Sequence, residues 1–168
     1  MINPTSRWAP GLLPGIMLGA CIAMSAHAAD SATGSLNYKG RSVDFKYAWL
    51  VTGPSDMEPG KVVRRLILAG TDIGAKLQAC KTFSCTDGEV MEGMTADFTG
   101  GPRINYWVAM NGQKIQYSGT ATPDAFTARA DAPGRLAGRL AIDDVAAGGP
   151  KLSAEFDVSM LKEFKVAR

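Results

Sequence analysis

The sequence predicts an all-β protein, an antiparallel β-sandwich or β-barrel of about nine strands with one short helix and one disulfide bond. Three observations lead to this fold class. Apolar and polar residues alternate with a period of two over much of 34–160, turn-forming pairs separate the alternating segments, and a single segment has helical spacing. The alternation is clearest over 151–160, where one face is expected to be core and the other solvated.

The first predicted strands lie at 35–38 and 42–51, joined by a turn at Lys39-Gly40. On the second of these, the period of two places four side chains on one face: Val43, Phe45, Tyr47 and Trp49. The next strand, 61–69, carries the continuous apolar run Leu66-Ile67-Leu68, which is typical of a central strand covered on both faces.

Two consecutive arginines, Arg64 and Arg65, precede that apolar run. Neighbouring residues of a strand point to opposite faces, so each face receives one guanidinium. We therefore expect at least one of them to pair with a carboxylate. A short helix is expected to follow from Asp72 to Cys80, where Ile73, Leu77 and Cys80 share a face.

The strongest local prediction is a β-hairpin around Asn111-Gly112, a pair suited to the two positive-φ positions of a type I′ turn. It joins a strand over 104–110 to one returning through 115–119. Alternation also predicts strands over 135–143 and 151–160, with turns at 100–102 and 131–134 and a loop at 146–150.

Composition excludes several classes of protein. The 168 residues are 46% hydrophobic and 20% charged, which rules out a disordered chain, a collagen and a protein with several membrane spans. Lys and Arg number 18 against 16 Asp and Glu, a net charge of +2, and the longest basic run is Arg64-Arg65. This charge distribution lacks the basic patch of a nucleic-acid-binding protein.

Residues 1–28 are interpreted as a secretory signal peptide. Arg7 precedes a mostly apolar stretch over 9–24, and small residues occupy the positions before a cut after Ala28. Residues 29–168 would then form a single domain in the periplasm or outside the cell, with no transmembrane segment. The alternative is a lipoprotein anchored at Cys21, because Leu18-Gly19-Ala20-Cys21 resembles a lipobox.

Cleavage after Ala28 would remove the single histidine and leave two cysteines, Cys80 and Cys85. In an oxidising compartment these are expected to form a disulfide bond. A zinc site would require further Cys or His ligands, and a Ser-His-Asp or Cys-His hydrolase requires a histidine base. No phosphate-binding glycine loop occurs either, so the sequence predicts neither a metal ion nor another cofactor.

Carboxylates are the remaining groups for catalysis, as in glycoside hydrolysis. The candidates are Asp87, Glu89 and Glu92, which follow the second cysteine, and the pair Asp143-Asp144. The structural explanation for the first group is a solvated loop after the disulfide. For Asp143-Asp144 it is the end of a strand followed by a turn.

Two features point to recognition of a partner. Trp107 alternates with expected core residues and so falls on the polar face beside Asn105, with Arg103 two positions further along. The ring closed by the disulfide would present Lys81 and Phe83 on a rigid loop. The structural explanations are that a second layer covers the tryptophan and that the phenylalanine packs beneath the loop.

The turn placement and strand pattern resemble uncharacterised exported periplasmic β-sandwich proteins of Gram-negative bacteria. The matching features are 34–40 followed by an aromatic strand, the Arg-Leu-Ile-Leu strand, Gly-Arg-Leu near residue 140 and the final Ala-Glu-Phe-Asp. The resemblance implies a sandwich fold and residence outside the inner membrane, and it carries over no functional residues.

Together these observations predict a non-enzymatic periplasmic or secreted binding protein with a protein partner in the cell envelope, such as an inhibitor or immunity protein against a toxin or cell-wall hydrolase. A carboxylate-dependent carbohydrate-active enzyme is the second hypothesis. The third is a carrier of a small apolar ligand in a β-barrel lined by methionines such as Met91, Met94 and Met110.

Overall fold

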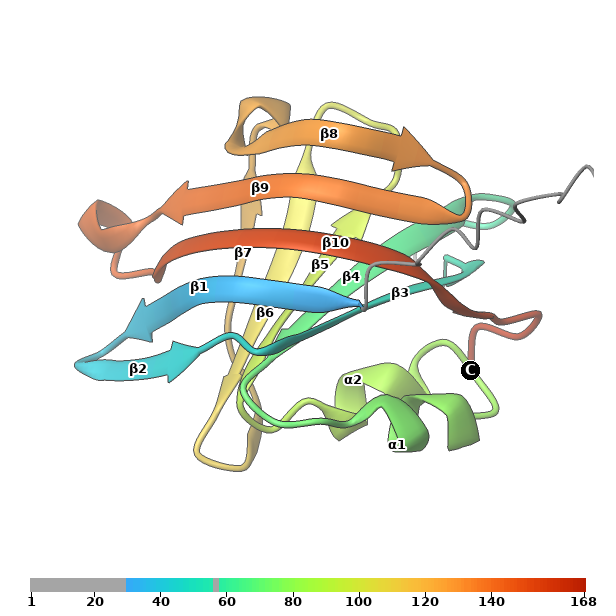
Figure 1. Cartoon of the computed structure of the whole chain (residues 1–168), viewed down its shortest axis with the longest axis horizontal. Helices are drawn as coiled ribbons and strands as arrows, with labels where there is room; N and C mark the ends of the chain where they lie inside the picture. Colours follow the sequence, from blue (N-terminus) through green and yellow to red (C-terminus); the bar gives the residue numbers. More distant parts are fainter. Residues whose placement is uncertain (1–29, 56–57) are drawn as a thin grey trace, which may run out of the picture.

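The protein is described by a computed structural model covering residues 30–55 and 58–168. Ten strands and two short α-helices make up this part of the chain, so the predicted all-β class is confirmed (Figure 1). The strands are β1 (Ser31–Tyr38), β2 (Arg41–Asp44), β3 (Tyr47–Pro54), β4 (Val62–Ala69), β5 (Gly93–Phe98), β6 (Ile104–Met110), β7 (Gln113–Ala121), β8 (Phe126–Ala132), β9 (Arg135–Asp143) and β10 (Lys151–Glu163). The helices are α1 (Gly74–Ala79) and α2 (Cys85–Glu89), and two 3₁₀ turns lie at Pro123–Ala125 and Val145–Ala147.

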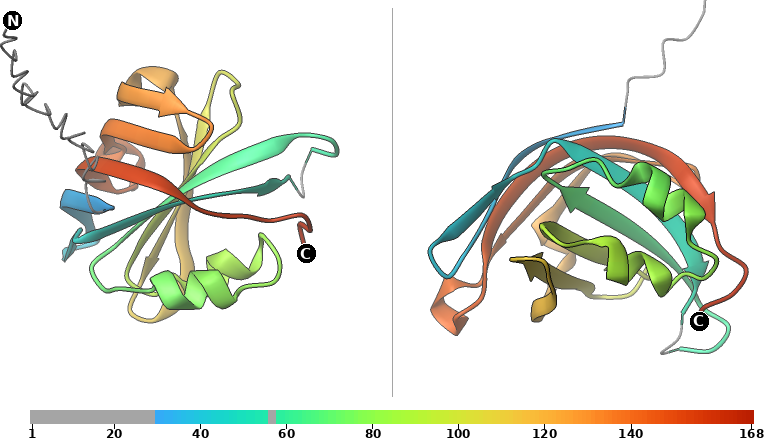
Figure 2. Two further views of the ribbon diagram at one scale, coloured as in Figure 1. Left: turned by 45° about the vertical axis from the view of Figure 1, so that its right-hand side comes forward. Right: turned by 90° about the horizontal axis from the view of Figure 1, so that it is seen from below.

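The strands form one curled sheet in which β10 is the junction. Along most of its length β10 lies antiparallel between β1 and β9, and near its end it pairs in parallel with β3. One half of the sheet therefore has the order β2-β1-β10-β9-β8 and the other runs β3-β4-β5-β6-β7. Figure 2 shows β10 crossing between the two halves, which curve over one another.

The first core fills the space between the two halves. Its residues are the inward-facing members of the alternating patterns, including the fully buried Leu50 of β3, Leu66 of β4 and Tyr106 of β6. The predicted alternation over 151–160 is confirmed, since Leu152, Phe156 and their even-numbered neighbours point into this core. Burial of these apolar faces is the main stabilising contribution.

A second core lies on the opposite face of β3 and β4. There Trp49 and Ile67 pack against residues of the helical segment, among them Leu77, Cys80 and Phe83. The run Leu66-Ile67-Leu68 is thus covered on both faces, as predicted for a central strand. The two helices lie along this face in Figure 1.

Both predicted tight turns are confirmed. Lys39 and Gly40 have φ values of 48° and 75°, and Asn111 and Gly112 have values of 62° and 63°. Positive φ at two successive positions is the geometry that closes a two-residue hairpin, and glycine at the second position adopts it without steric cost.

The predicted single strand over 42–51 is wrong. The chain leaves β2 after Asp44 and enters β3 at Tyr47, passing from one half of the sheet to the other. Phe45 is buried in the first core and Trp49 in the second, so the expected common face does not exist. This crossing contributes to ten strands in place of about nine.

The predicted helix over Asp72–Cys80 is present as the shorter α1, with Ile73, Leu77 and Cys80 buried together in the second core. The second helix, α2, was expected to be a loop. The signal peptide, its cleavage after Ala28 and the lipidation of Cys21 lie outside the described residues. None of the helices in the described ranges combines the length and apolar character needed to cross a membrane.

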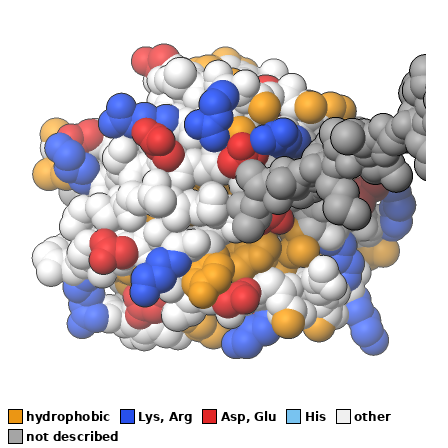
Figure 3. Space-filling model, viewed as in Figure 1, with side chains coloured by type: hydrophobic (Ala, Val, Ile, Leu, Met, Phe, Trp, Pro, Cys, Tyr) orange, Lys and Arg blue, Asp and Glu red, His pale blue; other side chains and the backbone are white. Residues whose placement is uncertain are grey.

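The exposed side of the β10 half of the sheet carries charges of both signs. Figure 3 shows basic and acidic side chains interspersed on this face. Asp157 of β10 accepts hydrogen bonds from Arg135 at 2.8 and 2.9 Å and lies 3.5 Å from Arg129. Interspersed, paired charges agree with the absence of a basic run from the sequence.

Candidate functional site

Trp107 lies on the outer face of β6. Its neighbours Tyr106 and Val108 are fully buried in the first core, whereas Trp107 and Asn105 are half-buried on the other face, as the alternation predicts. Strand pairing places Thr95 of β5 on one side of the tryptophan and Ser118 of β7 on the other. The indole is thus held in the middle of three paired strands.

The two larger hollows that adjoin this side chain are lined by described residues as follows. The first, which we name the Trp107 hollow, has a volume of about 170 Å³ and is lined by Ser55, Glu58, Val63, Arg65, Phe83, Asp87, Asp97, Thr99, Asn105, Trp107, Ile115 and Arg168. The second is a more open depression of about 340 Å³ that shares Asn105 and Trp107 and is otherwise lined by Ser118, Gly119 and Thr120. Residues from the strands, the disulfide loop and the end of the chain thus meet around the half-buried Trp107.

A buried ion cluster forms one wall of the Trp107 hollow. Arg65 of β4 donates from Nε and Nη2 to the two oxygens of Asp97 at 2.7 and 2.9 Å. Its Nη1 donates to Asp87 at 2.6 Å and to the Thr86 hydroxyl at 3.2 Å. The Arg65 and Asp97 side chains are 7% and 8% exposed, whereas that of Asp87 is 36% exposed. Bidentate pairing of this kind gives the guanidinium a defined plane.

The fixed guanidinium also packs between aromatic rings. Its central carbon lies 4.3 Å from the ring centre of Phe83 and 5.7 Å from that of Trp107, within the range of cation–π attraction. Burial alone would lower the pKa of Arg65, but hydrogen bonding and charge from Asp97 and Asp87 outweigh it and raise that pKa above its ordinary value. The arginine is therefore a permanent cation in this wall.

The disulfide loop is built around this cluster. Cys80 and Cys85 are bonded, with Cα atoms 5.6 Å apart, so the predicted disulfide is confirmed. Helix α2 begins at Cys85, and the buried hydroxyl of Thr86 donates to the carbonyl of Phe83 at 2.7 Å. The end of the chain pairs with the same loop through Phe83 N to the carbonyl of Val166, at 2.9 Å.

The structure brings together some of the predicted binding residues and separates others. Asn105, Trp107 and Phe83 line the Trp107 hollow, while Lys81 and Arg103 are exposed outside it. Phe83 was expected to be presented to a partner, and this expectation is wrong, because its ring is only 3% exposed. Phe83 supports the wall by packing beneath Arg65 and edge-on to Phe164.

The candidate catalytic carboxylates occupy separate environments. Asp87 is bound to Arg65, and Glu92 accepts a hydrogen bond from the backbone of Asn111 at 2.8 Å. Glu89 lies beside the disulfide, where its carboxylate and the sulfurs of Cys80 and Cys85 come within 4.8 Å of one another. Those sulfurs are oxidised, so they cannot act as thiolate ligands for a metal.

The second predicted carboxylate pair is also divided. Asp143 accepts a hydrogen bond from Lys151 at 2.7 Å, which with its own backbone contact to Val145 lowers its pKa. Asp144 accepts a hydrogen bond from the hydroxyl of Tyr106. Burial raises the pKa of Tyr106 and the bond to Asp144 raises it further. These contacts place Asp144 in a structural role beneath the first core.

The three methionines considered as the lining of a ligand cavity have other positions. Met94 and Met110 are fully buried in the first core, where they pack among β4, β6 and their neighbours, and Met91 is exposed. Core packing therefore accounts for Met94 and Met110.

Sequence reasoning missed the centre of the cluster. Arg65 was placed on a strand face opposite Arg64, which is correct, and both arginines have carboxylate partners. However, Asp97 was not considered. Arg65 shares its face with the apolar Val63 and Ile67, and a charge on such a face requires a buried partner, which is the signal that could have revealed the pairing.

No protein-family model, curated protein or solved structure matches this chain. A function can therefore be proposed only from the geometry of the site. The resemblance to periplasmic β-sandwich proteins stays a prediction.

Proposed function

We propose that this protein is a non-enzymatic binding protein of the cell envelope, and that its partner is a protein that docks over the Trp107 hollow. The observation that carries the proposal is a half-buried tryptophan that lies beside a buried arginine–carboxylate cluster. Tryptophan and arginine are the residues most enriched among those that dominate binding energy at interfaces. Because the frame is already ordered, binding would cost little additional conformational entropy.

The size of the Trp107 hollow favours an inserted side chain. Its volume of about 170 Å³ falls below the range of roughly 300–1,000 Å³ that is typical of small-molecule pockets. A protein partner could place one side chain in this hollow and cover the neighbouring depression of about 340 Å³ with its surface. Exposed Ile115 on β7 would extend the apolar part of that interface.

The chemistry of the wall supports binding over catalysis. Two of its carboxylates, Asp87 and Asp97, are hydrogen-bonded to one permanently charged guanidinium. A general base works best when it is free to take a proton near the operating pH. Inhibition of a toxin or cell-wall hydrolase is the form of binding that the predicted export favours.

Site-specific photo-crosslinking in the native host tests the proposal. A crosslinking amino acid at Ser118, which is exposed beside Trp107, is expected to yield one discrete protein adduct. The matched control is the same amino acid at Glu155, exposed on β10 in the other half of the sheet, which should yield none.

The adduct must also depend on the indole. Adding Trp107→Ala should abolish the adduct at Ser118, and with the purified partner the same change should weaken binding by about 2 kcal/mol, roughly thirtyfold. The proposal fails if Ser118 gives no adduct, or if the adduct persists unchanged without Trp107 while the variant remains folded.

A further inference from the structure

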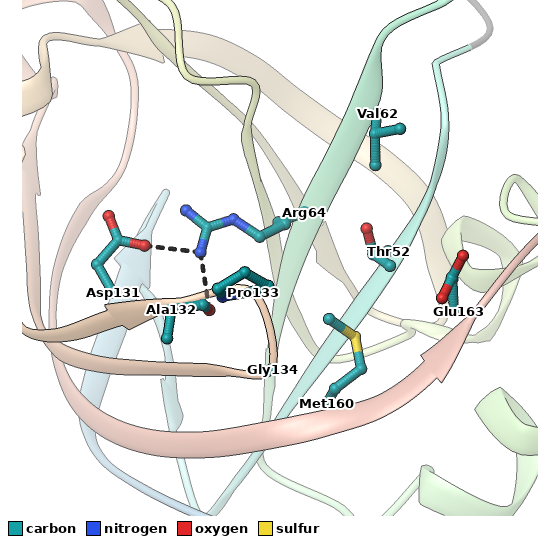
Figure 4. A pocket seen from close by; sticks show the side chains of 9 residues that line it. All are labelled: Thr52, Val62, Arg64, Asp131, Ala132, Pro133, Gly134, Met160 and Glu163. Atoms are coloured by element: carbon teal, nitrogen blue, oxygen red, sulfur yellow. Dashed lines mark hydrogen bonds and ion pairs between the residues drawn. The ribbon is translucent and has the colours of Figure 1, made fainter.

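A groove opens where the two halves of the sheet diverge. It lies on the opposite face of β4 from the Trp107 hollow. Leu66 is fully buried on the inner face of this strand, and the same face continues outward through Arg64 to Val62. Opposite them lie the β8–β9 turn and the end of β10, leaving a volume of about 680 Å³ (Figure 4). We name this volume the inter-sheet groove, and its size lies within the range of small-molecule pockets.

One end of the groove carries a guanidinium with an available edge. Nη1 of Arg64 contacts Asp131 at 2.6 Å and donates to the carbonyl of Ala132 at 3.2 Å. Both contacts use the same nitrogen, as Figure 4 shows, and within the described residues Nε and Nη2 of Arg64 donate to no protein group. These two nitrogens present parallel N–H groups, the geometry that binds a carboxylate through both of its oxygens.

The middle of the groove is apolar. Val62, which is 64% exposed, and the half-buried Met160 line it together with Pro133 of the β8–β9 turn. Exposed apolar side chains on a concave surface are typical of ligand sites, and methionine adapts its shape to flexible chains. At the other end lies Glu163, an exposed carboxylate that is ion-paired with Lys165.

We propose that the inter-sheet groove binds a monocarboxylate with a single alkyl chain. The carboxylate accepts hydrogen bonds from Nε and Nη2 of Arg64, and the alkyl chain lies along Val62, Pro133 and Met160. This site is independent of the proposed docking of a protein at Trp107. It assigns a ligand of defined chemistry to a face of β4 that the protein partner does not use.

Calorimetric titration of the purified protein with decanoate, below its micelle concentration and near neutral pH, tests this proposal. Decanoate is expected to bind more tightly than decanol, which lacks the charge. Arg64→Gln should weaken decanoate binding about tenfold or more, because it removes a charge-assisted pair of hydrogen bonds. The matched control is Arg139→Gln, an exposed arginine on β9, which should leave binding unchanged.

A second variant tests the apolar part of the groove. Val62→Glu places a negative charge beside the expected chain and should abolish decanoate binding, whereas Val145→Glu, at a valine of similar exposure (57%) elsewhere, should not. Because Val62 is so exposed, the change is expected to leave the fold intact. Nuclear magnetic resonance of the unmutated protein gives a readout free of folding effects, since decanoate should shift the Arg64 Nε–H and Met160 methyl signals.

The proposal is overturned if decanoate does not bind, if decanol binds as tightly, or if Arg64→Gln and Arg139→Gln have equal effects. Trp107→Ala should leave decanoate binding unchanged, while Arg64→Gln should leave the photo-crosslinked adduct at Ser118 unchanged. The two proposals can therefore fail separately.

Discussion

Replacing Arg65 with alanine should destabilise the protein far more than the same change at the preceding residue. In Arg65→Ala, the Asp97 carboxylate stays buried, 8% exposed, without the guanidinium to which both of its oxygens are hydrogen-bonded. Removing one member of a buried ion pair costs about 3–5 kcal/mol. Arg64 instead pairs with the half-exposed Asp131, and an exposed pair contributes at most about 1 kcal/mol.

Urea unfolding followed by circular dichroism would measure the free energy of unfolding of both variants. The neighbouring arginines form a matched pair, since they share a strand and a residue type and differ in the face on which they lie. We expect Arg65→Ala to lose at least about 3 kcal/mol and Arg64→Ala to lose about 1 kcal/mol or less.

A double-mutant cycle would separate the ion pair from packing. In Arg65→Ala with Asp97→Ala, both members of the buried ion pair are gone, so the combined loss should fall short of the sum of the single losses by about 2 kcal/mol or more. Equal losses in Arg64→Ala and Arg65→Ala, or strictly additive effects of Arg65 and Asp97, would refute the reasoning from burial.

Three further predictions concern stability. Replacing both Cys80 and Cys85 with serine should lower the free energy of unfolding by about 2 kcal/mol, because the six-residue ring no longer restricts the unfolded chain. Gly53→Ala should cost about 1–3 kcal/mol in thermal or urea unfolding, since a Cβ atom there would lie 2.6 Å from the Phe83 ring. Hydrogen bonds from Arg135 lower the pKa of Asp157 in the folded protein below its value in the unfolded chain, which is about 4. The Arg135–Asp157 pair therefore stabilises the fold fully at a pH above the unfolded pKa, and this contribution is lost as the pH falls through the folded pKa. The Asp157→Asn variant should therefore lose less stability on acidification than the unmutated protein. The difference should be smaller than about 1 kcal/mol, and unfolding measured at stepwise lower pH would show it.

Each of these predictions has a control in the chain. Chemical reduction of the unmutated protein should reproduce the effect of the two serine substitutions. Gly134→Ala, where a Cβ meets no atom within 4 Å, should be nearly neutral, and a loss equal to that of Gly53→Ala would contradict the steric explanation. Arg135→Gln should mimic Asp157→Asn, and an unchanged acid profile in both would show that the pair does not stabilise the fold.

Local patterns were sufficient to predict the all-β class, both tight turns and most inward-facing residues. The alternation around Trp107 also placed it correctly on the outer face of β6. These features depend on one strand and its immediate neighbours, so a period of two or a positive-φ pair is enough to specify them.

Features that depend on distant parts of the chain could not be predicted in this way. The break between β2 and β3 occurs inside an uninterrupted apolar–polar alternation, and only the crossing between the two halves of the sheet reveals it. Helix α2 has five residues, including Gly88, and lacks an apolar repeat. Its position is set by the disulfide and by the contacts of Arg65 with Thr86 and Asp87.

The burial of Phe83 has the same origin. A phenylalanine in a short disulfide ring suggests presentation to solvent, but the end of the chain pairs with this loop and Phe164 packs against the ring. Residues about 80 positions apart thus determine its exposure, and no local pattern records that contact.

The position of β10 governs when the molecule can fold during synthesis. This strand is the last of the described strands along the chain. It nevertheless pairs with β1, β9 and β3, and so it joins the two halves of the sheet. Until β10 has been synthesised, a growing polypeptide lacks the strand that joins the two halves, and the apolar surfaces of β1 and β3 have no lasting cover. The native sheet can therefore form only after β10 has been synthesised, although the strands that it joins precede it along the chain.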